Sequence, residues 1–385
     1  MSPRLRIDPD ELVACVGCGL CLPHCPTYRV TAEETRSPRG RIAAMRAVER
    51  GDAAIDGTFT RLMDECVQCR GCEAACPSGV AFGHLMEGAR DTLAAEAGYQ
   101  PWWKRAGYAV LGRHRLLLAA SSALAVAQRL RLVPPSLGLP ERLPVRRRPL
   151  AASGADVYLF TGCVMDAWMR DTHRAVQRVV EATGAGVALP GAGGDCCGAL
   201  HVHAGLRDGA RHLAERVMRS MPGDQPVLVD SAGCGAAMKE YGHLVGTEEA
   251  RAFSARVRDV HEWLADRLDA LPEARRRFPV AVAVQDPCHL RHVQRTHLPV
   301  RAVLARYADL VELDDEGLCC GAGGAYSAQQ PELAADIRDR KIAAVRRAGA
   351  TVVASANPGC VMHLRAGGLD VRHPLEIVAE ALDGR

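Results

Sequence analysis

Cysteine thiols are the most chemically informative side chains in this 385-residue sequence, which contains sixteen of them. Eight lie before residue 80, four between residues 163 and 234, and four between residues 288 and 360. Clustered cysteines bind metals in reducing compartments, whereas in secreted chains they form disulfides. Residues 1–13 contain Pro, Arg and Asp and lack the apolar segment of a signal peptide. We therefore expect a cytoplasmic protein whose cysteines bind metal.

Two copies of one spacing account for the first eight cysteines. Each copy has the pattern C-x₂-C-x₂-C-x₃-C-P, over residues 15–26 and 66–77. This pattern is typical of bacterial proteins with two [4Fe–4S] clusters, in which the fourth cysteine ligates the other cluster. Structural zinc sites instead use two distant C-x₂-C pairs. We predict two [4Fe–4S] clusters, the first held by Cys15, Cys18, Cys21 and Cys76, and the second by Cys66, Cys69, Cys72 and Cys25.

The last eight cysteines belong to an internal repeat. Each copy has one cysteine, then a Cys-Cys-Gly, then a last cysteine; the two sets are Cys163, Cys196, Cys197 and Cys234, and Cys288, Cys319, Cys320 and Cys360. Short apolar runs precede these positions at 157–160, 187–189 and 227–229, and at 282–284, 310–313 and 351–354. Strands that alternate with helical stretches predict parallel sheets, and loops at the carboxyl ends of such strands converge on one edge. We expect two pseudo-symmetric sites, each able to hold a further iron–sulfur cluster, a zinc ion or free thiols.

The elements that position these cysteines predict an α+β chain of four parts. Residues 1–100 form a helix-rich two-cluster ferredoxin-type domain, with a helix over 41–50. Residues 101–154 form a helical connector and a Pro/Arg linker, 155–275 the first α/β Cys-Cys-Gly domain, and 276–385 the second. The apolar run over 116–127 would span about 18 Å as a helix, too short for a hydrocarbon core of about 30 Å. We expect no transmembrane segment, and we expect a buried or partner-docking helix rather than one that lies on a membrane surface.

Other side chains suggest no acid–base or nucleotide chemistry. The glycine stretches 191–194 and 321–324 lack the G-x-G-x-x-G spacing, so we expect no FAD or NAD in this chain. We expect hydrogen bonds rather than metal ligation from the histidines near the cysteines, His201, His203, His289 and His363. The net charge of +3 and the 4% aromatic content give no reason to expect nucleic-acid binding.

The chain resembles the iron–sulfur subunits of bacterial glycolate oxidase. The likeness is closest over residues 14–28, over Ser37-Pro-Arg-Gly-Arg-Ile42 and over Cys76-Pro-Ser-Gly-Val80. The two repeats look like the cysteine-rich domains found in heterodisulfide reductase, in lactate-utilisation proteins and in anaerobic glycerol-3-phosphate dehydrogenase. The heterodisulfide-reductase form ends in Cys-x-x-Cys, whereas Ala237 and His363 occupy those last positions here.

The resemblance implies an electron-transfer subunit with no catalytic residue for the hydroxy acid. FAD-containing dehydrogenase subunits would oxidise glycolate to glyoxylate, and this chain would pass the electrons to a quinone-type acceptor, in the cytoplasm or peripherally on the inner face of the membrane. The alternatives are an iron–sulfur subunit of lactate or anaerobic glycerol-3-phosphate dehydrogenase, and a heterodisulfide-reductase-like disulfide reductase. The missing fifth cysteines count against the last. A further alternative makes the repeats a metal-stabilised docking module for the flavin subunits.

Overall fold

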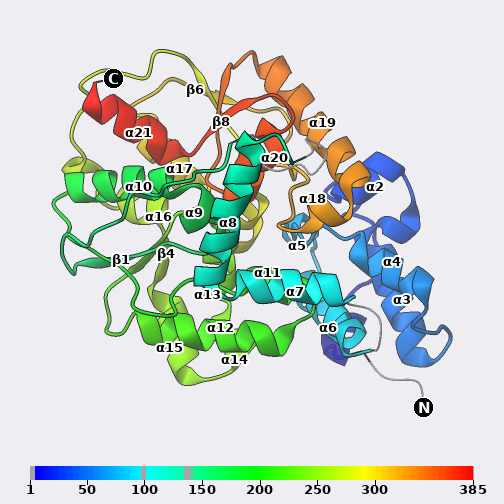
Figure 1. Ribbon diagram of the computed structural model, residues 1–385. Coiled ribbons are helices and arrows are strands. Elements are labelled where there is room, and N and C mark those ends of the chain that lie inside the picture. Colours follow the sequence, from blue (N-terminus) through cyan, green and yellow to red (C-terminus); the bar gives the residue numbers. More distant parts are fainter. Residues whose placement is uncertain (1–4, 97–100, 134–139, 141, 385) are drawn as a thin grey trace.

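The computed structural model describes residues 5–96, 101–133, 140 and 142–384 (Figure 1). The ferredoxin-type domain contains six α-helices and one short 3₁₀ helix: α1 (Pro9–Val13), α2 (Pro26–Thr31), η1 (Glu34–Arg36), α3 (Pro38–Arg50), α4 (Gly57–Asp64), α5 (Gly71–Ala74) and α6 (Phe82–Ala95). They pack around buried Met45, Met63, Leu85 and Met86. The helix expected over 41–50 is confirmed, but it begins earlier because Ser37 caps it by accepting from Gly40 N–H and Pro38 suits its first turn.

The connector consists of two helices, α7 (Trp102–Leu111) and α8 (His114–Arg129), which meet at 105°. The apolar run expected over 116–127 lies within α8. Among the described residues, no single helix is both long and apolar enough to cross a membrane. Leu117, Ser121 and Ala125 on one face of α8 are buried, and Leu117 packs against Cys163 and Leu213 of the first Cys-Cys-Gly domain.

The first Cys-Cys-Gly domain has a four-stranded parallel sheet of order β2-β1-β3-β4. Its strands are β1 (Val157–Phe160), β2 (Val187–Ala188), β3 (Val227–Val229) and β4 (Val257–Asp259). Its helices are α9 (Val164–Trp168), α10 (Arg170–Ala182), α11 (Ala199–His203), α12 (Arg207–Ser220), α13 (Ala232–Lys239), α14 (Tyr241–Val245), α15 (Glu248–Arg256) and α16 (Val260–Ala265), followed by η3 (Leu268–Ala270).

The second Cys-Cys-Gly domain repeats this topology with the strand order β6-β5-β7-β8. Its strands are β5 (Val282–Val284), β6 (Leu310–Glu312), β7 (Val352–Ala354) and β8 (Asp370–Arg372), all parallel. Its helices are a π-helix η4 (His289–Gln294), α17 (Leu298–Leu304), α18 (Tyr326–Gln329), α19 (Pro331–Ala348), α20 (Pro358–Arg365) and α21 (Pro374–Asp383). The pseudo-symmetric α/β pair is thus confirmed, with one more strand in each sheet than the apolar runs predict.

The two Cys-Cys-Gly domains share one hydrophobic core. Buried side chains of the first sheet, such as Val157 and Leu159, belong to the same cluster as Val282 and Val284 of the second. The ferredoxin-type domain contacts both of them. Arg90 on α6 donates to the carbonyl of His203 at 2.7 Å, and His289 of the second Cys-Cys-Gly domain lies 3.0 Å from the carbonyl of Gln68. All three cysteine-bearing domains therefore meet near the centre of the molecule (Figure 1).

Candidate metal centres

The structure brings Cys15, Cys18 and Cys21 together with Cys76 around one cavity. Gly17 and Gly19 have positive φ values of 72° and 84°, which let the loop turn tightly between its cysteines. Arg39 fixes this loop from α3 by donating to the carbonyl of Gly17 at 2.8 Å. Cys18 is exposed to solvent. We call Cys15, Cys18, Cys21 and Cys76 the outer quartet.

A second cavity is lined by Cys25, Cys66, Cys69 and Cys72, which we call the inner quartet. All four of these side chains are buried. Arg41, itself 1% exposed, holds the loop of Cys25 in place by donating to the carbonyls of Arg36 and Leu62. Burial holds the pKa of the Cys72 thiol well above its ordinary value. The fourth cysteine of each motif thus lies beside the other motif's three, as the sequence assignment requires.

The chemistry of both cavities suits iron–sulfur clusters. Their walls contain cysteine and apolar groups together with the cations Arg39, Arg41 and Arg70, and the described residues lining them include no carboxylate. Cysteine thiolates are the ligands of [4Fe–4S] clusters, and nearby cations and N–H donors offset the negative charge of such a group. Gln68 N–H, for example, lies 3.4 Å from the Cys66 sulfur.

All eight cysteines of the repeats line a single cavity of ≈ 170 Å³. The two sites expected from the sequence therefore open into one space between the domains. Each set stands at the carboxyl edge of its sheet: Cys163 follows β1 and Cys288 follows β5, while the last cysteines lie on α13 and α20 after the third strands. We call these sets the first repeat quartet (Cys163, Cys196, Cys197, Cys234) and the second repeat quartet (Cys288, Cys319, Cys320, Cys360).

Thiols within each repeat quartet contact one another. Cys320 and Cys360 have their sulfur atoms 3.2 Å apart. In the first repeat quartet, contact with the Cys196 thiol and burial hold the pKa of Cys163 well above its ordinary value. Contact with Cys234 has the same effect on the pKa of Cys197. Such groups of thiols can bind a metal or a cluster, or exchange electrons as dithiol and disulfide.

The inner quartet touches the second repeat quartet. The Cys69 thiol contacts the Cys319 thiol, and this contact together with burial holds the pKa of Cys69 well above its ordinary value. Both cysteines lie in one buried cluster with Val67, Tyr326 and Ile337. Two sites that are 250 residues apart in the sequence are therefore in direct contact.

The glycine stretch 321–324 makes this contact possible. Gly323 has a φ of 50°, and a Cβ there would lie 2.9 Å from Val67 Cγ1 of the inner-quartet loop. Gly324 similarly faces Leu200 of the first Cys-Cys-Gly domain. The stretch thus provides room for neighbouring domains to approach the backbone.

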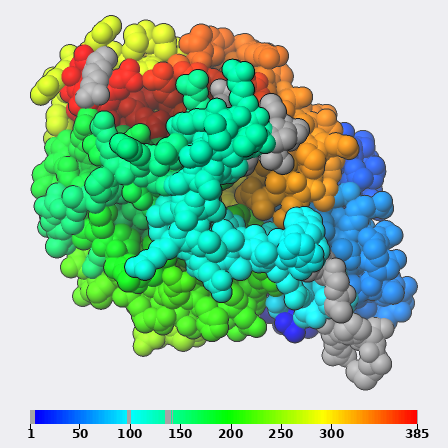
Figure 2. Space-filling model, in the orientation of Figure 1, coloured from blue at the N-terminus to red at the C-terminus, as the bar shows by residue number. Residues whose placement is uncertain are grey.

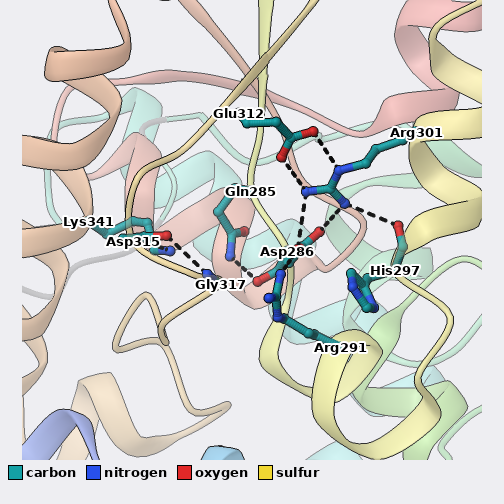
Figure 3. A network of polar contacts seen from close by, with 9 residues as sticks. All are labelled: Gln285, Asp286, Arg291, His297, Arg301, Glu312, Asp315, Gly317 and Lys341. Carbon is teal, nitrogen blue, oxygen red and sulfur yellow. Dashed lines mark hydrogen bonds and ion pairs between the residues drawn. The ribbon is translucent and has the colours of Figure 1, made fainter. Parts of the chain in front are cut away.

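A polar network fixes the loops that bear the second repeat quartet (Figure 3). Asp286, which is 3% exposed and two residues before Cys288, accepts from Arg301 at 2.8 Å and from Arg291 at 2.8 Å. Arg301 also donates to Glu312 of β6 at 2.6 Å. Despite burial, these arginines lower the pKa of Asp286, so that its carboxylate stays charged. Sequence reasoning missed Asp286 and both arginines, because no spacing marks them.

A buried Asp–His pair beside the shared cavity was also missed. Asp230 lines the cavity and lies 2.6 Å from Nδ1 of fully buried His173, whose Nε2 is 2.7 Å from the Thr161 carbonyl. Burial lowers the pKa of His173, but the Asp230 carboxylate outweighs it and the net shift is upward. Asp230 follows β3 at a strand end, which is the one sequence signal that could have suggested it.

The four histidines near the cysteines differ in their surroundings. His289 and His363 lie 3.0 and 3.1 Å from the backbone carbonyls of Gln68 and Ala334, as expected for hydrogen-bonded rings. His203 packs edge-on against His289, with ring centroids 5.5 Å apart, and both line the shared cavity. His201 packs against Tyr108 of α7.

Comparison with known proteins agrees with this arrangement. A family model described as a 4Fe-4S dicluster domain matches residues 11–80, and one described as a cysteine-rich domain matches residues 157–239 and 282–365. The probable glycolate oxidase iron-sulfur subunit of Bacillus subtilis is 32% identical, over 94% of this chain and 90% of the relative. The glycolate oxidase iron-sulfur subunit of Escherichia coli is 31% identical, over 98% and 96%.

A more distant relative has a different electron-transfer role in its name. It belongs to the dihydromethanophenazine:CoB–CoM heterodisulfide reductase of Methanosarcina barkeri and is 28% identical, over 97% of this chain and 94% of the relative. Identity above 30% along almost the whole of both chains occurs with the glycolate oxidase subunits. Together with the dicluster and cysteine-rich domains, this shows that the chain belongs to the family of glycolate oxidase iron–sulfur subunits.

Proposed function

We propose that this chain is the electron-transfer subunit of a cytoplasmic glycolate dehydrogenase complex. FAD-containing partner subunits would oxidise glycolate to glyoxylate, and the chain would conduct the electrons to a quinone-type acceptor. Oxidation of the hydroxy acid releases two electrons and two protons, and reduction of a quinone to a quinol consumes the same number. The chain itself would have no catalytic contact with the hydroxy acid.

One observation carries this proposal: the cysteine sets form a continuous series from the surface to the centre of the molecule. The outer quartet includes exposed Cys18, the inner quartet is buried, and Cys69 of the inner quartet touches Cys319. Cys72 lines both N-terminal cavities. A purely structural metal site would need neither the series nor the contact between its members.

The residues proposed to hold the two [4Fe–4S] clusters are the outer and inner quartets, and such clusters supply one-electron redox centres when bound. The chain's own contribution is to fix the spacing of the quartets and to keep water from the inner one. Arg41 and Arg70 place positive charge beside the inner quartet. The repeat quartets are proposed to hold a further cluster or zinc, or to act as thiols.

The surface around the outer quartet fits a partner protein. Val16 and Leu20, which line the outer-quartet cavity beside Cys18, are 74% and 56% exposed, and Val13 at the end of α1 is 70% exposed. Exposed apolar side chains around a redox site allow a partner to exclude water there and to bring its own redox group close. We propose that the FAD-containing subunits dock on this face.

The test is reduction of the assembled complex by its substrate. The chain, purified anaerobically with its flavin subunits, should show EPR signals of reduced [4Fe–4S] centres on addition of glycolate. Val16→Asp combined with Leu20→Asp should slow this reduction at least tenfold and leave reduction by dithionite unchanged. Val280→Asp, at a 39% exposed position of the second Cys-Cys-Gly domain, is the matched control.

Other outcomes would redirect the proposal. Reduction by lactate or glycerol 3-phosphate, and not by glycolate, would change the substrate and keep the electron-transfer role. Zinc in place of iron in the N-terminal quartets would disprove that role.

A further inference from the structure

The α7–α8 helix pair concentrates the exposed apolar surface of the molecule. Six of the eleven large hydrophobic side chains that are exposed in the described chain lie on these helices or within three residues after α8: Trp102, Trp103, Leu116, Val126, Leu130 and Leu132. Trp102 is 80% exposed and Trp103 56%. Figure 2 shows this pair, in cyan and teal, lying across one face of the molecule.

The outward face of α8 is apolar between Arg115 and Arg129, which are exposed near its two ends. Its buried stripe is Leu117, Ser121 and Ala125. The opposite stripe, at the same helical spacing, is exposed and consists of Leu116, Ala119, Ala120, Ala123, Val126 and Leu130. A surface helix in contact with water has a polar outward face. The outward face of α8 therefore has the composition of a surface that is in contact with an apolar environment rather than with water.

Positive charge surrounds this apolar face. Residues 97–140 contain six lysines and arginines and no aspartate or glutamate, although the whole chain has a net charge of only +3. Five of these cations are exposed and lie at or near the helix ends: Arg105, Arg113, Arg115, Arg129 and Arg131. Long basic side chains at the ends of an apolar stripe can extend to anionic head groups while their stems remain in the apolar layer.

We propose that α7 and α8 lie flat on the surface of an anionic lipid bilayer, with the tryptophans and the outward stripe of α8 in the interfacial layer. The 105° bend and the length of each helix allow both to lie in one plane, whereas neither spans a membrane alone. Exposed tryptophan, an apolar stripe and basic ends without acidic residues together favour a lipid surface over an acidic protein partner.

The position of the pair gives this contact a consequence for electron transfer. The inner face of α8 packs through Leu117 against Cys163 and Cys196 of the first repeat quartet. A bilayer on the outer face would lie about one helix diameter, roughly 10 Å, from these thiols. This consequence rests on the proposed function, in which the acceptor is a quinone dissolved in lipid. The proposed contact with the bilayer does not depend on the proposed function.

Vesicle flotation with the complete, iron-loaded chain tests the contact without any electron transfer. The chain should float with vesicles of phosphatidylcholine containing about 30% phosphatidylglycerol, and at least tenfold less with pure phosphatidylcholine. Binding should weaken as salt rises, since the charges at the surface are screened. Trp102→Ser with Trp103→Ser, and separately Val126→Glu, should each lower the partition coefficient at least tenfold.

Two matched control variants distinguish binding through this face from nonspecific binding to vesicles. Leu298→Glu changes a 62% exposed apolar residue elsewhere, and Arg61→Gln removes an exposed cation on α4. Both should leave flotation unchanged, with iron content and circular dichroism verifying that all variants fold. Failure of the unchanged chain to bind anionic vesicles would overturn the proposal, as would equal binding by Val126→Glu and Leu298→Glu. If the unchanged chain does not bind vesicles and the Trp102→Ser/Trp103→Ser variant loses its flavin subunits, the proposal is wrong and this face binds a protein partner.

Discussion

At the scale of single residues, the two N-terminal motifs have the same spacing but different environments. Cys18 in the first motif is exposed, whereas Cys66, Cys69 and Cys72 of the second are all buried. Cys25 ends the first motif and yet is buried beside the second. Cys25 is the N-cap residue of α2, whose first helical residue is Pro26.

This exchange of fourth cysteines leads to a specific prediction. Cys25→Ser should remove the same EPR signal as Cys66→Ser, and Cys76→Ser the same signal as Cys18→Ser. Each variant should lose about four irons per chain, because one cubane needs all four thiolates. Iron analysis and EPR of the dithionite-reduced variants are the measurements. If Cys25→Ser removed the signal that Cys18→Ser removes, the assignment would be wrong.

At the scale of elements, the structure depends on close approach between segments from different domains. The loop 321–324 approaches both the inner-quartet loop and the first Cys-Cys-Gly domain through backbone without side chains. Positive φ values at Gly321, Gly323 and Gly324 make this path accessible only to glycine without strain. The glycine spacing in the sequence cannot reveal which segments will approach this loop.

Gly323→Ala should destabilise the junction between the ferredoxin-type and Cys-Cys-Gly domains. The new methyl group would lie 2.9 Å from Val67 Cγ1 and 2.7 Å from Tyr326 Cβ. We expect a loss of about 2–4 kcal/mol in the free energy of unfolding, from backbone strain plus overpacking. Urea unfolding measures the total loss of stability. Faster hydrogen exchange of the backbone amides of residues 66–72 should show that the loss occurs at this junction.

Gly349→Ala is the matched control for that experiment. Gly349 ends α19 with a φ of 70°, and a Cβ there meets nothing within 4 Å. Backbone strain alone should cost about 1 kcal/mol. Equal losses in the two variants would show that the contact with Val67 contributes nothing.

At the scale of the whole molecule, a half-buried acid lies between the ferredoxin-type domain and the first Cys-Cys-Gly domain. Glu87 on α6 lines a small cavity together with Glu240 and His243 from the other domain. Burial, and to a lesser extent the charge of Glu240, raise the pKa of Glu87 to about 7. The folded state thus binds this proton more tightly than the unfolded state, whose glutamate titrates near 4.5.

The stability of the assembled domains should therefore fall as the pH rises from about 4.5 to about 7. Between these values the unfolded state has released the proton and the folded state still retains it, so the slope is negative. We expect Glu87 to contribute about 2 kcal/mol to the free energy of unfolding. This is less than a fully buried carboxyl with the same pKa would contribute, because Glu87 keeps some exposure to solvent. Glu87→Gln should flatten the slope of thermal or urea stability with pH, and the exposed Glu248→Gln should not. An unchanged slope in Glu87→Gln would rule out this role.

The sequence alone identified the cysteine motifs, the internal repeat and most of the strands. Cysteine spacing is local, so it revealed both ferredoxin motifs and the Cys-Cys-Gly repeat, and apolar runs located β1, β2, β3, β5, β6 and β7. The strands β4 and β8 were missed because Val257-Arg-Asp and Asp370-Val-Arg contain one apolar residue each and sit at sheet edges. Neither segment has the apolar–polar alternation or the continuous apolar run that predicts a strand.

Only the tertiary structure decided how these parts meet. It joined the two repeat quartets in one cavity, placed Cys69 against Cys319, and surrounded Asp286 with Arg291 and Arg301. These contacts join residues that are distant in the chain, and they depend on the packing of several domains at once. Local spacing indicates which thiols can bind a cluster. The order of electron transfer between the cysteine sets depends instead on the distances between the sets, which are determined only in the folded chain.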